Sequence, residues 1–173
     1  MRNEALNVIY TRRSVRSFTS EAVSKDDLMK LLRAGMSAPS AVNVQPWSFV
    51  VVTGRQTLDK LCEHLPYAKM LDKAGAAIVV CGILDKDEVY SKQYWVMDCS
   101  AATQNILLAA HAIGLGSVWT AVYPDMDRVK TVREILNIPD NIIPLNVLPI
   151  GVPKGTGQAI DKFNEENIRW EKW

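Results

Sequence analysis

The chain has 173 residues, of which 48% are hydrophobic and 23% charged, and its formal net charge is +1. This composition is typical of one globular domain, and a domain of this length buries its core without disulfides or a structural metal. The near-neutral charge argues against a nucleic-acid-binding protein, which needs a broad basic face, and no apolar run is long enough to span a membrane.

The cysteines and the N-terminal segment indicate a cytoplasmic protein. The first ten residues lack the long apolar core of a signal peptide. The three cysteines are widely spaced, and Cys81 and Cys99 lie in apolar stretches, which predicts buried reduced thiols. With two histidines and no close cysteine pair, the sequence supplies no ligand set for a zinc site.

Helices and strands are predicted in turn along the first half of the chain. Ser24 followed by Asp27 is a helix-start pattern, and Pro39 disfavours helical geometry at the residue before it. Short runs rich in β-branched residues predict buried strands. The predicted elements are helices at 3–12, 24–37 and 55–73, the last interrupted at Pro66, and strands at 47–53 and 76–84, with a loop at 39–46.

The second half begins with a long helix over residues 91–113, which is apolar over much of its circumference. Such a helix is buried on several sides, and in a small domain this suggests that one side faces another subunit. Pro149 predicts a bulge or an edge position in the last strand. The remaining predicted elements are strands at 117–122 and 145–152, a helix at 125–136, and a polar tail at 154–173.

The mixture of elements predicts an α+β fold rather than a doubly wound one, because a wound parallel sheet needs a more regular alternation of strand and helix. The tail is polar but carries Phe163, Ile168, Trp170 and Trp173. We interpret it as an extension that wraps a partner surface; the alternative is that it folds back on its own domain.

Residues 12–16 read Arg-Arg-Ser-Val-Arg and place three guanidinium groups within five positions. Arginine binds phosphate bidentately, and serine adds a neutral donor, so this run is a candidate anion site. The alternative is a solvated basic segment. A second segment, residues 37–47, has two prolines and presents Ser40, Asn43 and Gln45, which suits a planar ligand with donors and acceptors. Together the two segments suggest a nucleotide-like cofactor.

Over nearly its whole length the chain resembles the nitroreductase family of flavin mononucleotide (FMN) enzymes. The order and spacing of four motifs and the end of the tail carry this resemblance. They are Arg-Arg-Ser-Val-Arg at 12–16, Ala-Pro-Ser-x-x-Asn-x-Gln-Pro-Trp at 38–47, Gly-Leu-Gly-Ser-x-Trp at 114–119, Ile-Gly-Val-Pro at 150–153, and the tail segments 161–164 and 170–173.

The resemblance implies a three-layer α+β fold, with a central mixed or antiparallel sheet of 4–5 strands between helices. It also implies an intertwined homodimer of single 173-residue domains, with FMN at the subunit interface. Arg12 and Ser14 would hold the phosphate, completed by Lys162 or alternatively Lys154, and Arg13 or Arg16 would reach the pyrimidine edge of the ring. The partner would supply Pro39, Ser40, Ala41 and Asn43, and Trp119, Thr120 and Ala121 would line the dimethylbenzene or N5 side.

The implied activity is NAD(P)H-dependent reduction of small-molecule acceptors such as nitroaromatics or quinones. The flavin carries the chemistry in a ping-pong scheme, so no protein residue is assigned as catalytic, although Arg16 could stabilise charge on the reduced ring. The choice between NADH and NADPH stays open. The alternatives are other flavin chemistry on the same scaffold, such as a dehalogenase or dehydrogenase, and a flavin-binding sensor without turnover.

Overall fold

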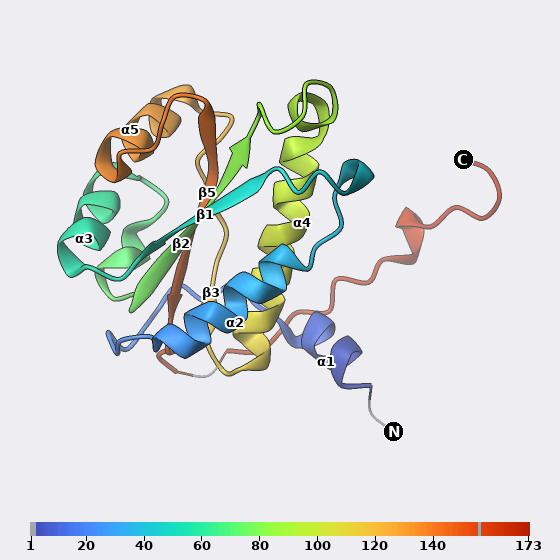
Figure 1. The fold of residues 1–173 in the computed structure, drawn as a ribbon. Helices are drawn as coiled ribbons and strands as arrows, with labels where there is room; N and C mark the ends of the chain where they lie inside the picture. Colours follow the sequence, from blue (N-terminus) through green and yellow to red (C-terminus); the bar gives the residue numbers. More distant parts are fainter. Residues whose placement is uncertain (1–2, 156) are drawn as a thin grey trace.

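Figure 1 shows the computed structural model, which describes residues 3–155 and 157–173. The helices are α1 (Glu4–Thr11), α2 (Lys25–Met36), α3 (Arg55–His64), α4 (Tyr90–Ala112) and α5 (Met126–Leu136), with 3₁₀ turns at Ala41–Asn43, Lys69–Asp72 and Glu165–Asn167. The strands are β1 (Trp47–Val52), β2 (Ala76–Ile83), β3 (Gly116–Ser117), β4 (Thr120–Ala121) and β5 (Ile142–Gly151).

The molecule has three layers, because alternate residues of its central strands enter two separate cores. The strand order is β1-β2-β5-β3, with β4 also paired to β5, and every pairing is antiparallel. On β2, Ala77, Val79 and Cys81 pack with α3 and α5, whereas Ala76, Ile78 and Val80 pack with α2 and α4. Figure 1 shows these helix pairs on opposite sides of the sheet. The predicted α+β fold with a central sheet between helices is confirmed.

The position of Pro149 corrects one expectation. β5 is a central strand, since β2 pairs with one side of it and β3 and β4 pair with the other. The edge position predicted for Pro149 is therefore wrong, and so is the alternative of a bulge there, because the register shift of the β2–β5 pairing lies between Val80 and Cys81. β3 pairs with residues 150–151 and β4 with residues 146–147, so the ladder on that side is interrupted opposite Pro149. A residue without an N–H is tolerated there because no strand pairs with it on that side.

The same interruption divides the predicted strand at 117–122 into β3 and β4. Val118 and Trp119 lie between the two short strands, with Val118 buried and Trp119 half-buried. Two other local predictions are confirmed. The Ser24 hydroxyl accepts the Asp27 N–H at 3.0 Å at the start of α2, and α3 ends at His64, just before Pro66.

The long helix α4 is buried on several sides, as its composition predicts. Its buried residues include Trp95, Cys99 and Ile106, which all enter the core beneath α2. Its outer face still exposes Met97, and the apolar residues of α1, Leu6 and Ile9, are also exposed. An apolar surface thus remains uncovered within one chain.

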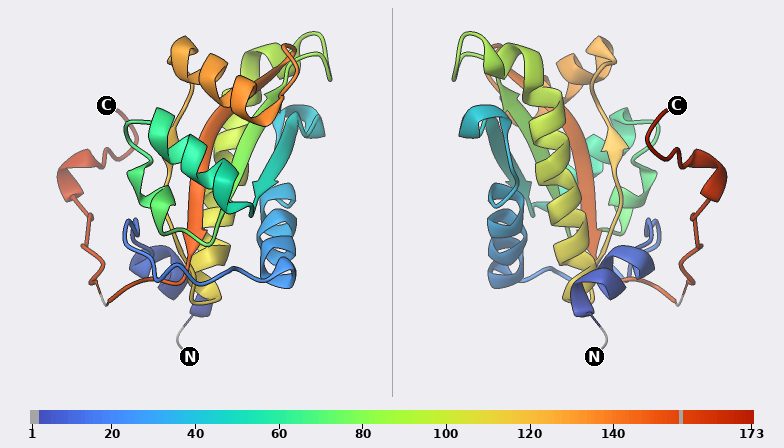
Figure 2. Two further views of the ribbon diagram at one scale, coloured as in Figure 1. Left: turned by 90° about the vertical axis from the view of Figure 1, so that its left-hand side faces the viewer. Right: turned by 90° about the vertical axis from the view of Figure 1, so that its right-hand side faces the viewer.

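The C-terminal tail lies outside the three layers. Both views of Figure 2 show it running away from the body of its own chain, and residues 157–173 are all exposed. Trp170 exposes 84% of its surface, so the tail does not fold back to bury its aromatic residues. Among the described helices, none is long and apolar enough to cross a membrane.

Candidate functional site

The arginine-rich segment is fixed by its neighbours rather than solvated along its whole length. The Thr11 hydroxyl lies 2.8 Å from Nε2 of His111 near the C-terminal end of α4. Four residues later, Val15 is buried and its N–H donates to the Ser117 carbonyl at 3.0 Å. The segment between them, residues 12–14, is therefore held at both ends.

Gly116 allows this segment to approach the sheet. A Cβ at Gly116 would lie 2.7 Å from Cγ1 of Val15, closer than real Cβ contacts. The second glycine of the Gly-Leu-Gly-Ser motif is thus required because Val15 packs directly against it. Because Val15 stands between Ser14 and Arg16, the position of the arginine run depends on this contact.

Arg12 and Lys162 line one groove. It has a volume of about 710 Å³ and is lined by α1, Gln104 of α4 and residues 159–163 of the tail. Lys154, the alternative candidate, does not line this groove; its N–H donates to the Ser17 carbonyl at 2.9 Å. Two of the three predicted phosphate ligands, Arg12 and Lys162, thus border a single hollow although they are far apart in the sequence.

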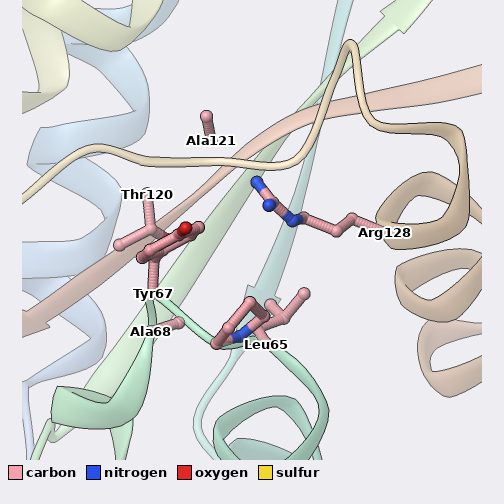
Figure 3. Close-up of a pocket in the computed structure, with 7 residues that line it drawn as sticks. Leu65, Tyr67, Ala68, Thr120, Ala121 and Arg128 are labelled. Atoms are coloured by element: carbon pink, nitrogen blue, oxygen red, sulfur yellow. The ribbon is translucent and has the colours of Figure 1, made fainter.

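Arg16 lines a different pocket, of about 550 Å³, together with the predicted residues Trp119, Thr120 and Ala121. Two further cations, Lys69 and Arg128, line the same pocket. Figure 3 shows the neighbouring hollow that shares Thr120, Ala121 and Arg128 with it, and the Arg128 side chain reaches from α5 toward Tyr67. The other lining residues are Pro66, Tyr67, Met70 and Val118.

No sequence motif points to Tyr67, Lys69 and Arg128 as functional residues. The guanidinium of Arg128 stacks over the Tyr67 ring at 4.9 Å and pairs with Asp125 at 3.1 Å. The Lys69 ammonium donates to the Cys62 and Glu63 carbonyls at 2.9 and 3.0 Å. Pro66 is the local feature that could have pointed to this region, because a proline ends the helix and allows the following residues to turn toward the sheet.

Arg13 and Ser14 lie between Arg12 and Arg16 in the sequence. The Arg13 guanidinium lies against Gly157, where a Cβ would come within 2.7 Å of its Cζ, and Ser14 is exposed. Neither residue lines the groove of Arg12 or the pocket of Arg16.

The proline-rich loop lies far from these residues in the same chain. The N–H of Ala41 donates to Asp98 at 3.0 Å, whereas Thr11 contacts His111. Asp98 and His111 are thirteen positions apart on the helix, which is about 20 Å along α4. Pro39 and Asn43 are exposed beside this end of the helix. One chain therefore does not bring the loop and the arginine run together.

The electrostatics of the arginine end favour an anion. Among the described residues, no carboxylate lies within ion-pair distance of Arg12, Arg13, Arg16 or Lys162. Burial, with Arg12 and Arg13 nearby, lowers the pKa of His111. The Thr11 O–H donates to the Asn7 carbonyl at 2.6 Å, so Nε2 of His111 is the donor in their contact. The arginines thus lie near an imidazole whose protonation they oppose.

The cysteines play no part in either hollow. Cys81 and Cys99 are buried free thiols, as the sequence predicts. Burial raises the pKa of Cys81 to about 12 and raises that of Cys99 as well, so both stay protonated and unreactive.

Several known proteins are similar to this chain in sequence and in fold. The chain is 49% identical to an Archaeoglobus fulgidus protein named "Putative NADH dehydrogenase/NAD(P)H nitroreductase", over 98% of this chain and 99% of the relative. A crystal structure with the same name from Bacteroides thetaiotaomicron has a TM-score of 0.94 and 47% identity, covering 100% of both chains. "A putative nitroreductase in complex with fmn" from Desulfovibrio desulfuricans has a TM-score of 0.82 and 29% identity, covering 100% of this chain and 99% of that one.

The model of the Nitroreductase family matches residues 9–66 and 61–152. These ranges contain the arginine run, the proline-rich loop, the glycine motif and the pocket around Arg16. The chain belongs to the nitroreductase family.

Proposed function

We propose that this protein is an FMN-dependent oxidoreductase that uses NADH or NADPH to reduce small-molecule acceptors such as nitroaromatics or quinones. The observation that carries the proposal is that Arg12 and Lys162 line one hollow and Arg16 lines another, with no carboxylate among the described residues within ion-pair distance of these three cations. A ligand with an anionic end and a planar polar ring matches this arrangement. The Desulfovibrio desulfuricans relative, whose structure is described as a complex with FMN, supports the choice of ligand.

The residues present fit FMN at each of its ends. Arg12, Ser14 and Lys162 would hold the phosphate, because guanidinium and ammonium groups bind phosphate oxygens by charge-assisted hydrogen bonds. Arg16, or Arg13 beside it, would reach the pyrimidine edge of the ring. Trp119, Thr120 and Ala121 would line the dimethylbenzene or N5 side, since they border the same pocket as Arg16.

Bound FMN would supply the hydride and electron transfer between nicotinamide and acceptor, a chemistry that places negative charge on the reduced ring. Arg16 would stabilise this charge, because no carboxylate among the described residues pairs with its guanidinium. Such an interaction is worth more in a pocket than in open water. Trp119 would exclude water from one side of the ring with its half-buried side chain.

The working unit in this proposal is a homodimer in which the partner supplies Pro39, Ser40, Ala41 and Asn43. The length of α4 supports it, since one chain holds its loop and its arginines about 20 Å apart. The uncovered apolar residues of α1 and α4 supply a surface that a second copy would bury. The tail at 154–173, exposed at residues 154–155 and 157–173, would be part of the same domain and would wrap the partner. The protein would act in the cytoplasm, where the reducing environment keeps cysteines free.

A mixed dimer tests whether each site is shared. A chain with Arg12→Ala and a chain with Asn43→Ala, coexpressed with different tags, would form a heterodimer with one intact site and one doubly altered site. We expect one FMN per heterodimer, against weak binding in either altered homodimer. If each site were built within one chain, the heterodimer would bind FMN as weakly as the two altered homodimers.

The activity is tested on the purified protein by its flavin absorbance. We expect a yellow protein that bleaches with NADH or NADPH and regains its colour when a quinone or nitroaromatic is added. Bleaching without recovery by an acceptor would favour a sensor or other flavin chemistry. A colourless protein that cannot be reconstituted with FMN would refute the proposal.

A further inference from the structure

We infer that Asp98 is a positioning residue that holds the loop of residues 40–45 in the shape that binds FMN. This inference rests on the proposed function, which assigns Ser40 and Asn43 of this loop to the flavin. Asp98 lies in the N-terminal half of α4, far from the arginine run. The loop passes beside the N-terminal part of this helix in Figure 1.

The loop has an unfavourable backbone conformation. Val42, Asn43 and Gln45 have φ of 42°, 59° and 55°, in the left-handed region that non-glycine residues seldom adopt. Val42 is the least suited, because its branched Cβ crowds the backbone there. Such residues persist only where their surroundings hold them, and they cluster at ligand-binding sites.

Within the loop, the Asn43 N–H donates to the Ser40 carbonyl and the Val44 N–H to the Ala41 carbonyl, both at 3.0 Å, so most of its hydrogen bonds are local. The Gln45 N–H donates to the Ser40 hydroxyl at 2.9 Å within the loop, and the exposed Lys86 donates to the Gln45 carbonyl at 2.8 Å. Among the residues that the structure describes, the buried side chain that hydrogen-bonds to this loop is Asp98, whose Oδ1 accepts the Ala41 N–H at 3.0 Å. That bond falls on the residue directly before the strained Val42.

Asp98 is itself placed against local preference. It is 6% exposed in the middle of a helix, and its Oδ2 has no hydrogen-bond partner among the described residues. Asp is a poor residue for a helix interior, and a buried carboxylate is costly. Burial raises its pKa, and only the bond from Ala41 opposes that shift. Helix stability therefore does not explain this residue, whereas the loop contact does.

The expected effect follows from the population of the binding shape. Without the bond to Ala41, the strained residues relax, and the apparent Kd for FMN rises as the inverse of the fraction of loops that remain competent. If about one loop in ten stays competent, the Kd rises about tenfold, which is about 1.4 kcal/mol.

The test uses Asp98→Ala and Asp98→Asn in the full-length dimer, with FMN affinity measured by fluorescence titration of the apoprotein. We expect about a tenfold weaker Kd for Asp98→Ala. Asp98→Asn should stay within about threefold of the wild type, because its amide oxygen can still accept the Ala41 N–H. Equal affinity of Asp98→Ala and the wild type, or equal loss in both variants, would overturn the inference.

Two further measurements separate positioning from general stability. Adding Val42→Gly to Asp98→Ala should recover part of the lost affinity, because glycine adopts positive φ without strain. Ile138→Val, in the core on the other face of the sheet, should lower Tm without weakening FMN binding. A matching loss of affinity in that control, or no recovery with Val42→Gly, would count against positioning.

Hydrogen–deuterium exchange of residues 38–47 in the apoprotein gives a readout that needs no flavin. Asp98→Ala should speed exchange there and leave the α3 and α5 side unchanged. Unchanged exchange in the loop would show that Asp98 does not hold it. A wild-type protein that binds no FMN would instead refute the proposed function, and the exchange data would still decide whether Asp98 holds the loop.

Discussion

Replacing Gly116 with alanine should damage both stability and FMN binding, although the residue itself donates no side chain. The new Cβ would lie 2.7 Å from Cγ1 and 2.8 Å from Cβ of Val15. Because even the Cβ of Val15 is too close, rotating the Val15 side chain cannot relieve the overlap. The backbone of the arginine segment must therefore move away from β3.

The magnitude follows from this overlap. Overpacking a buried contact costs about 1–3 kcal/mol, and a chain of this size loses about 2–4 °C of Tm per kcal/mol. We expect Tm to fall by about 2–12 °C by these two estimates. If the shift also breaks one hydrogen bond from the arginine run to the phosphate, about 1.5 kcal/mol is lost, and the Kd for FMN rises about tenfold.

Gly114→Ala is the matched control. Gly114 has φ of 81° and no atom within 4 Å of a built Cβ, so alanine there adds only backbone strain of about 1–2 kcal/mol. Thermal melts and flavin titrations should show both variants destabilised, but only Gly116→Ala impaired in FMN binding. Equal FMN affinity in the two variants, or a Gly116→Ala protein as stable as the wild type, would refute the reasoning.

Three further predictions concern single side chains. Lys162→Ala should weaken FMN retention in equilibrium dialysis about tenfold, by the loss of one charged hydrogen bond, and Lys154→Ala should not. Arg16→Ala should slow flavin reduction in stopped-flow absorbance; unchanged binding and rate would exclude its role. Burial and the nearby arginines lower the pKa of His111 below 6.5, so the unfolded chain takes up its proton first on acidification, and the free energy of unfolding falls as the pH drops below about 6.5. His111→Asn should lose this part of the acid destabilisation in thermal melts over about pH 5–8.

The fold could be predicted wherever local chemistry decides the structure. The β-branched run at 47–52 and the apolar run at 76–83 form strands β1 and β2. Helix α2 begins after Ser24, whose side chain accepts the Asp27 N–H. These features need no knowledge of distant residues. Pro149 shows the opposite case, because its place in a central strand depends on where two other strands leave a gap.

For the candidate site, the sequence points to charged residues but not to how the fold groups them. Arg12 and Arg16 were both predicted as ligands from one short run, and the structure places them at two different hollows. Lys69 and Arg128 join Arg16 because separate helices and turns converge on β4. No spacing in the sequence reports that convergence, since it arises from the packing of α3 and α5 on one face of the sheet.

The loop at 40–45 shows a different route to functional residues. A branched residue at positive φ and a buried acid in mid-helix are each unfavourable by local rules, and here a hydrogen bond joins Asp98 to the residue before Val42. Natural sequences violate such rules mainly where function requires it, and other contacts compensate. Two violations linked through one hydrogen bond to Ala41 therefore mark a site more specifically than either does alone. Neither is visible before the backbone is known, because the unfavourable φ of Val42 and the burial of Asp98 are properties of the folded chain.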